Sequence, residues 1–240
     1  KQIAEHEVKR NLTPQVAYPD LTLGQKAAFE IIRTHFTERS ETQLLLGIYG
    51  GPGTGKSVVV DSVMCLLRET VRTMAFVGQA AFHVNGTTIH SLLKLPLNLK
   101  QPFDLPDARL EELHNELKNV RYFIIDEISM VSKHLLIWIS KRLSQAFYNK
   151  DPFGGRNVIL VGDFSQLSPI FGHSVWRTIG QYGEGLALYY LFKDVIMLKA
   201  HENQRIDSKD QEAAQFANLL DEIRRGVLSD DNYKLLMTRS

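Results

Sequence analysis

The sequence predicts an α/β fold, in which a mostly parallel sheet is covered by helices on both faces. Short apolar runs suited to buried strands alternate with stretches whose apolar residues recur at helical spacing. A glycine-rich loop follows the first apolar run and an acidic pair ends the third, so polar groups lie where α/β proteins bind ligands. The 240 residues suit one large domain, or one domain with appendages.

The composition is that of an ordinary globular protein, with 44% hydrophobic and 23% charged residues. The formal net charge of +1 gives no overall basic field, so any surface for nucleic acid must be local. A single cysteine excludes a disulfide framework and a cysteine-rich zinc site. No apolar run is long enough to span a membrane and no secretory segment is present, so we expect an intracellular protein without a membrane partner.

We expect residues 1–20 to form an N-terminal tail ahead of a domain spanning residues 21–240. That domain begins with an apolar stripe typical of a helix, in which Thr22 and Gln25 form a capping box. Gln25 has a second interpretation, because a glutamine just ahead of a phosphate-binding loop can pair with an adenine edge. The local pattern alone favours the helix cap.

The segment Gly50–Ser57 reads G-x-x-x-x-G-K-S, the phosphate-binding P-loop. It lies between a buried strand predicted over residues 44–49 and a helix marked by Val59, Val63, Leu66, Leu67 and Val71. Its glycines let backbone N–H groups converge on phosphate oxygens, and the helix N-terminus adds positive charge.

Within this loop, Lys56 is expected to reach the β- and γ-phosphates, and the Ser57 hydroxyl is expected to bind Mg²⁺. The residues expected to hold the nucleotide are Gln25, Gly51, Pro52, Gly53, Thr54, Gly55, Lys56, Ser57 and Val58.

A second strand is predicted over residues 73–77, and a third over residues 121–125 ends in Asp126 and Glu127. We expect Asp126 to hold Mg²⁺ through its water shell and Glu127 to orient and deprotonate the attacking water. A carboxylate pair at a strand end can also merely start a turn, but a P-loop earlier in the chain favours the catalytic interpretation.

A fourth strand is predicted over residues 157–161 and is followed by Gln166. This glutamine can sense the γ-phosphate if its strand lies between the P-loop strand and the Asp126 strand; the alternative is a turn amide. A fifth strand is predicted over residues 195–198, and a helix over residues 210–226 that ends at Gly226.

Six segments together resemble the 5′-to-3′ DNA helicases of superfamily 1B. They are LTLGQ, GGPGTGKS, AAFHVNGTTIHSLLKL, FIIDEISM, LVGDFSQLSPI and ENQR. Within that class the chain is most similar to the PIF-type (petite integration frequency) family and its relatives in Helitron elements. The resemblance runs from Leu21 to the C-terminus and implies the first RecA-like P-loop NTPase domain of such a helicase.

The resemblance also implies roles for single residues. Gln25 would contact adenine, Gln166 would couple the γ-phosphate to DNA, and Arg205 would reach towards the γ-phosphate. Thr88 and His90 would lie along single-stranded DNA, although the residues alone do not decide between this role and a structural one for His90. The family usually has Pro-Thr-Gly where this chain has Phe76-Val77-Gly78, which removes a threonine expected to bond a DNA phosphate.

The expected function is the ATP-hydrolysing motor domain of a 5′-to-3′ DNA helicase, with ATP and Mg²⁺ as cofactors and roles in DNA repair and recombination. Its expected partners are single-stranded DNA and a second RecA-like domain in the full-length protein, which would supply an arginine finger. The isolated domain is then expected to be a monomer that hydrolyses ATP slowly and cannot unwind a duplex. The resemblance favours the nucleus, with the mitochondrion and the cytoplasm as alternatives.

Two other functions fit parts of the sequence. One is a truncated or repurposed helicase domain that binds DNA or protein without productive unwinding. The other is a P-loop ATPase that binds no nucleic acid.

Overall fold

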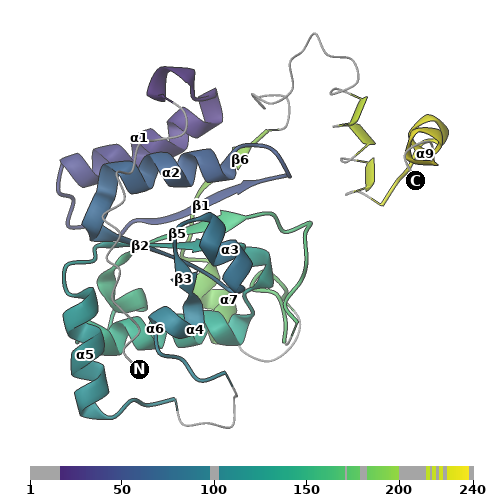
Figure 1. Ribbon diagram of the computed structural model, residues 1–240. Helices are drawn as coiled ribbons and strands as arrows, with labels where there is room; N and C mark the ends of the chain where they lie inside the picture. The colour runs from purple at the N-terminus through teal and green to yellow at the C-terminus, as the bar shows by residue number, and fades with distance from the viewer. Residues whose placement is uncertain are drawn as a thin grey trace, which may run out of the picture.

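A six-stranded, all-parallel sheet in the order β3-β2-β4-β5-β1-β6 forms the centre of the protein (Figure 1). The structure is a computed structural model that describes residues 17–97, 103–170, 172–178, 183–199, 215–216, 218–219, 222–223 and 226–237. The strands are β1 (Leu45–Gly50), β2 (Val71–Ala75), β3 (Thr87–Thr88), β4 (Tyr122–Asp126), β5 (Asn157–Gly162) and β6 (Asp194–Leu198).

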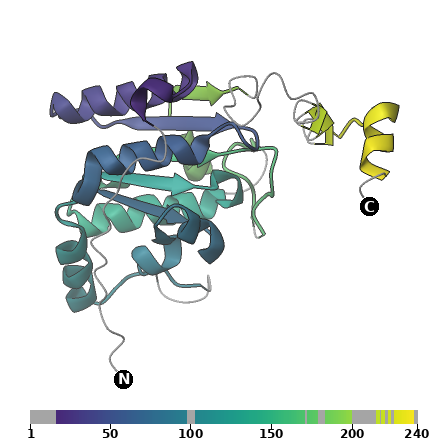
Figure 2. The same cartoon turned by 45° about the horizontal axis from the view of Figure 1, so that its top comes forward.

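Helices cover the sheet on both faces, with α1 and α2 on one side and α5, α6 and α7 on the other (Figures 1 and 2). The α-helices are α1 (Leu23–Thr37), α2 (Lys56–Leu67), α3 (Gly78–His83), α4 (Ile89–Leu92), α5 (Asp107–Leu117), α6 (Lys133–Ala146), α7 (Gly183–Tyr189) and α9 (Asp230–Met237). The short 3₁₀ helices are η1 (Tyr18–Asp20), η2 (Arg68–Thr70), η3 (Ile128–Met130) and η4 (Pro152–Gly155).

The strands are continuous apolar runs because both faces of the sheet are buried. In β4, Tyr122 and Ile124 pack in the core beneath α1 and α2, whereas Phe123 and Ile125 pack in the core beneath α5 and α6. All four side chains are at most 1% exposed. The predicted α/β fold with helices on both faces of a parallel sheet is therefore confirmed.

All five predicted strands are present, each within two residues of its expected bounds. Val71 is the exception to the predicted helix after the P-loop, because it opens β2 instead. Arg68 ends α2 with a left-handed φ of 49°. Val71 therefore belongs to the apolar run of β2, and its helical spacing from the apolar residues of α2 is a coincidence.

Parts of two predicted segments lie outside the described residues. These are residues 1–16 of the expected tail and most of the helix expected over residues 210–226. Gly226 is described, and its φ of 69° suits the predicted helix-ending position.

The order of the strands places three loops beside one another. β5 pairs with β1 on one side and with β4 on the other, so the loop after β5 lies between the P-loop and the Asp126–Glu127 pair. This is the arrangement that the proposed role of Gln166 requires. Among the helices that the structure describes, none is long and apolar enough to cross a membrane.

Candidate nucleotide-binding site

The P-loop connects the end of β1 at Gly50 to the start of α2 at Lys56. Gly55 has a φ of 82°, and a Cβ added there would overlap the Gln25 side-chain amide, so only glycine fits this position. The Lys56 ammonium donates hydrogen bonds to the carbonyl oxygens of Gly50 at 2.8 Å and Gly51 at 3.0 Å. The lysine thus lies over the concave side of the loop where phosphate is expected.

Gln25 serves the helix cap and the P-loop at the same time. Its side-chain oxygen accepts from the Thr22 backbone N–H at 2.9 Å, which completes the predicted capping box. Its side-chain nitrogen donates to the carbonyl oxygen of Thr54 at 3.3 Å. Gln25 is 2% exposed, so α1 anchors the loop through a buried amide.

Replacing Gln25 with alanine is expected to destabilise the domain by about 2 kcal/mol, because the cap is lost and the Thr54 carbonyl is left buried and unpaired. The affinity for a fluorescent ADP analogue should also fall by about fivefold, the equivalent of one lost anchoring hydrogen bond. Thr22→Ala is the matched control, because it removes the cap but keeps the bond to Thr54. Equal nucleotide affinities for the two variants would contradict the anchoring role.

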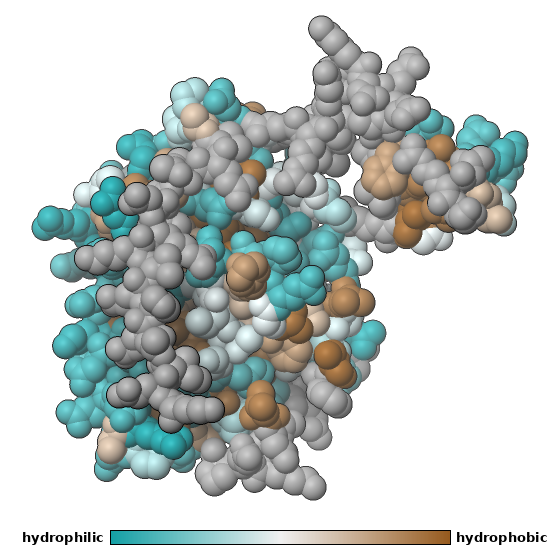
Figure 3. Space-filling model, viewed as in Figure 1, coloured by the Kyte–Doolittle hydropathy of each residue, from teal (hydrophilic) through white to brown (hydrophobic). Residues whose placement is uncertain are grey.

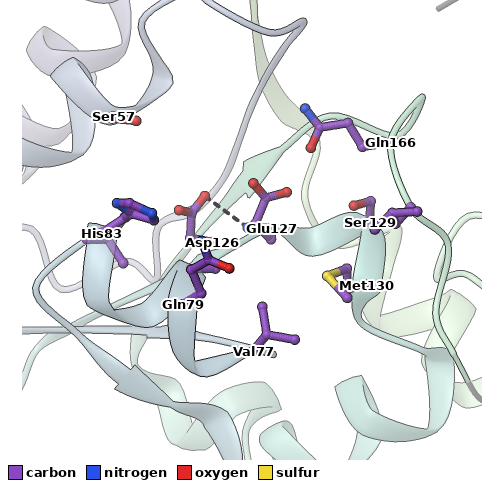
Figure 4. A pocket seen from close by; sticks show the side chains of 12 residues that line it. Ser57, Val77, Gln79, His83, Asp126, Glu127, Ser129, Met130 and Gln166 are labelled. Carbon is purple, nitrogen blue, oxygen red and sulfur yellow. Dashed lines mark hydrogen bonds between the residues drawn. The ribbon is translucent and has the colours of Figure 1, made fainter.

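The acidic pair stands at the carboxyl end of β4. The Glu127 N–H donates to Asp126 Oδ1 at 2.9 Å, and Glu127 adopts a left-handed φ of 51° (Figure 4). This conformation is strained for a residue with a side chain, and such strain concentrates at functional sites. Gly162 at the end of β5 makes it possible, because a Cβ there would lie 2.9 Å from the Ile128 nitrogen.

The Asp126 carboxylate is half-buried at the end of β4. Burial raises its pKa to about 6, and the neighbouring Glu127 charge adds to this, against opposing contributions from the Glu127 N–H and Lys56. A buried carboxylate whose pKa is raised by desolvation gains from a bound cation.

Gln166 lies on a turn that its own backbone helps to close, since its N–H donates to the Asp163 carbonyl oxygen at 3.0 Å. Its side chain is not part of that turn and lines the cleft. Ser57 reaches the cleft from the P-loop side, facing Glu127 and Gln166 (Figure 4). The structure thus brings together the P-loop, the acidic pair and the predicted sensor.

The cleft has a volume of about 360 Å³. The residues that line it without having been singled out from the sequence include Gln79, Ala80 and His83 on α3, and Ser129 and Met130 on η3. Ser129 is 2% exposed, and its hydroxyl has no hydrogen-bond partner among the described residues. The mixture of small and polar residues after the second strand was the available signal for α3, but it did not indicate which residues face the cleft.

The predicted DNA contacts lie away from this cleft. The Thr88 hydroxyl accepts the Ser91 N–H at 3.2 Å and so caps α4, which gives it a structural role. The His90 ring packs edge-on against Phe76 at 5.9 Å, and burial lowers its pKa. Arg205 lies outside the described residues.

Comparison with known proteins identifies the family. Residues 20–234 match the family described as PIF1-like helicase. The ATP-dependent DNA helicase PIF1 of Candida albicans is 29% identical over 228 residues, covering 84% of this chain and 23% of that protein. The ATP-dependent DNA helicase Pif1 of Psychrobacter is 32% identical over 191 residues, covering 73% of this chain and 27% of that protein.

Solved structures agree with this match. The crystal structure of Pif1 helicase from Candida albicans has a TM-score of 0.66 at 27% identity, covering 89% of this chain and 46% of the other. The Bacteroides Pif1 helicase in complex with ADP-AlF3 and ssDNA has a TM-score of 0.63 at 26% identity, with coverages of 86% and 48%. This chain therefore spans about a quarter of the two curated relatives and about half of these solved chains. Because the family match extends over most of the sequence, the chain belongs to the PIF1-like helicase family.

Proposed function

We propose that this domain binds and hydrolyses ATP as the first motor domain of a 5′-to-3′ DNA helicase acting on single-stranded DNA. The observation that carries the proposal is the position of β5 between β1 and β4. It brings Gln166 to the same cleft as Ser57, Asp126 and Glu127. Family membership supports DNA as the partner, since the relatives are ATP-dependent DNA helicases.

The residues present fit a magnesium–nucleotide complex. Mg²⁺ is usually held by one or two carboxylates together with substrate phosphates rather than by a cage of protein ligands. The Ser57 hydroxyl and the Asp126 carboxylate supply such a set, and the desolvation that raises the pKa of Asp126 supports a cation beside it. When bound, Mg²⁺ would neutralise the phosphate charge that develops during transfer.

The nucleotide would exchange the bonds that Lys56 makes to its own loop for bonds to phosphate oxygens. Gln25 is the proposed adenine contact, because its described bonds leave one N–H and one oxygen lone pair unused. This remaining donor and acceptor match the edge pattern of adenine. Val58, Pro52 and Gly53 remain predicted contacts of the loop.

Hydrolysis would begin when a water attacks the γ-phosphorus while the Glu127 carboxylate accepts its proton. The bond between the γ-phosphorus and the ADP oxygen breaks, and ADP leaves. Gln166 would contact the transferred phosphoryl group and relay its presence to the DNA surface. A second RecA-like domain and Arg205 are proposed to complete the stabilisation of the charge that develops in the transition state. An arginine in such a position can raise the rate of hydrolysis by about 10³–10⁵-fold.

The test is ATP hydrolysis with and without a thymidine oligonucleotide, compared between the wild type and Lys56→Ala. We expect stimulation by the oligonucleotide in the wild type and no hydrolysis in the variant. Oligonucleotide binding without ATP turnover, unaffected by Lys56→Ala, would instead show a repurposed binding module. Turnover without oligonucleotide binding at any salt concentration would show an ATPase that does not act on nucleic acid.

A further inference from the structure

Ser129 carries a hydroxyl group that the fold does not use. It is the second residue of η3 and is 2% exposed. Its side-chain oxygen has no hydrogen-bond partner among the described residues, although the residue lines the nucleotide cleft. A buried polar group without a partner costs stability, so the position of this hydroxyl calls for a functional explanation.

The turn that holds Ser129 is fixed without its hydroxyl. The Met130 N–H donates to the Glu127 carbonyl oxygen at 3.0 Å, and this bond closes the turn. The Val131 N–H donates to the Ile128 carbonyl oxygen at the same distance. The side chains of Ile128 and Val131 are fully buried in the core beneath α5 and α6. Ser129→Ala should therefore leave the turn intact.

The Glu127 carboxylate is an acceptor that lacks a donor. The backbone N–H of Glu127 donates to Asp126, but no described residue donates a hydrogen bond to the Glu127 side chain. A glutamate side chain turns about several bonds, and a catalytic base is usually oriented by a further group. One carboxylate oxygen takes the proton, so the other oxygen is the one that a donor can hold.

Ser129 stands beside this carboxylate. In Figure 4, Glu127 lies between Asp126 and Ser129, and all three residues line the same cleft. Glu127 directly precedes η3, so a single residue separates it from Ser129 along the chain. Asp126 already accepts the Glu127 N–H and is the proposed ligand of the cation. The Glu127 carboxylate is therefore the acceptor best placed for the Ser129 hydroxyl.

The surroundings favour a bond between these two groups. Val77, Val84 and Met130 give the cleft apolar walls. In Figure 3 apolar surface gathers around the α3 and α4 side of the domain, whereas the side formed by α1, α2 and α5 is largely hydrophilic. A hydroxyl bonds a charged acceptor more strongly than a neutral one, and the gain is larger where the surroundings are apolar.

We propose that Ser129 is a positioning residue for ATP hydrolysis, whose hydroxyl donates a hydrogen bond to one oxygen of the Glu127 carboxylate. The inference rests on the proposed function, since it assumes that Glu127 accepts the proton of the attacking water. With one oxygen held by Ser129, the other faces the water and takes its proton. Ser129 itself touches neither the water nor the nucleotide and acts through Glu127.

The test is Ser129→Ala, compared with the wild type in ATP hydrolysis and in chemical denaturation. The kcat is expected to fall at least about tenfold, the usual contribution of a hydrogen bond to a charged group. The KM for ATP and the affinity for ADP should not change, because only the positioning of the base is lost. The free energy of unfolding without nucleotide should not fall, since the hydroxyl has no partner in the described fold.

Ser140→Ala is the matched control. Ser140 is another buried serine, on α6 and outside the cleft. Its hydroxyl oxygen accepts the Phe153 N–H at 2.9 Å, so its loss leaves a buried donor unpaired. Ser140→Ala should therefore lower the free energy of unfolding and leave the kcat unchanged, the opposite of the pattern expected for Ser129→Ala.

A double variant tests whether Ser129 acts through Glu127. In the Glu127→Gln background the base is absent, so its orientation no longer affects the rate. Adding Ser129→Ala to this background should then cause no further loss in single-turnover hydrolysis.

A wild-type kcat in Ser129→Ala, or the same fold loss of rate in the wild-type and Glu127→Gln backgrounds, would overturn the inference and leave the proposed function standing. A loss of stability in Ser129→Ala as large as that in Ser140→Ala would give Ser129 a structural role and would also overturn it. Absence of ATP hydrolysis in the wild type would overturn the proposed function and this inference with it.

Discussion

Replacing Glu127 with glutamine is expected to lower the rate of ATP hydrolysis by about 10²–10⁴-fold, the usual contribution of a general base. Glutamine keeps the size of the side chain and its hydrogen-bonding oxygen but cannot take a proton from water. Because Glu127 stands beside the phosphate loop and is not part of it, the affinity for ADP should stay close to that of the wild type. The measurement is steady-state phosphate release together with titration of a fluorescent ADP analogue.

Glu112→Gln is the control for this experiment, because Glu112 is an exposed residue of α5 outside the cleft. It should hydrolyse ATP at the wild-type rate. A Glu127→Gln variant that retains more than about a tenth of the wild-type rate would assign the proton transfer to another group.

Replacing Asp126 with asparagine is expected to raise the free energy of unfolding by about 3 kcal/mol at pH 7.5 without Mg²⁺. The pKa of Asp126 is raised from 3.8 to about 6 in the folded protein, so the folded state binds the proton more tightly than the unfolded state. Ionised Asp126 therefore opposes folding at neutral pH, and removal of its charge relieves that cost. Asparagine keeps the oxygen that accepts the Glu127 N–H.

The pH dependence of this effect has a defined sign. At low pH the carboxyl is protonated in both states, and the difference between the wild type and the variant should vanish. As the pH rises from 3.8 to about 6, the unfolded state ionises first and the wild type loses stability relative to the variant. Above that range the difference should be constant.

Magnesium should reverse the order of stability. Added Mg²⁺ with ADP is expected to stabilise the wild type and to have much less effect on Asp126→Asn, because the charge that attracts the cation is gone. Chemical denaturation across pH, with and without Mg²⁺, measures both effects. Asp194→Asn replaces an exposed carboxylate on the edge strand β6. It should change neither the pH dependence of stability nor the stabilisation by Mg²⁺ with ADP. A variant that is less stable than the wild type at pH 7.5 without Mg²⁺ would show that burial does not control this carboxylate.

Much of the fold could be predicted because local pattern decides it. The strands are buried on both faces, so each reads as an unbroken apolar run, and all five predicted runs became strands. The P-loop and the acidic pair could be predicted because their roles depend on residue types at fixed spacing. Short elements such as β3 and α4 were missed, since two to four residues carry too little pattern to identify them.

Gln25 shows where local reasoning was incomplete. The sequence left a choice between a helix cap and a contact to adenine. The structure confirms the cap and adds a bond to Thr54, which lies 29 residues away along the chain. One side-chain amide has enough donors and acceptors to do more than one of these tasks.

By itself, the sequence determined the presence of a phosphate loop, an acidic pair and a parallel sheet, since each depends on residues that are neighbours along the chain. Only the tertiary structure decided that β5 lies between β1 and β4 and that α3 lines the cleft. The physical reason is that backbone pairing and side-chain packing between distant segments select the order of the strands. The apolar pattern of each strand is a local property, and it would be the same for any order of the strands in the sheet.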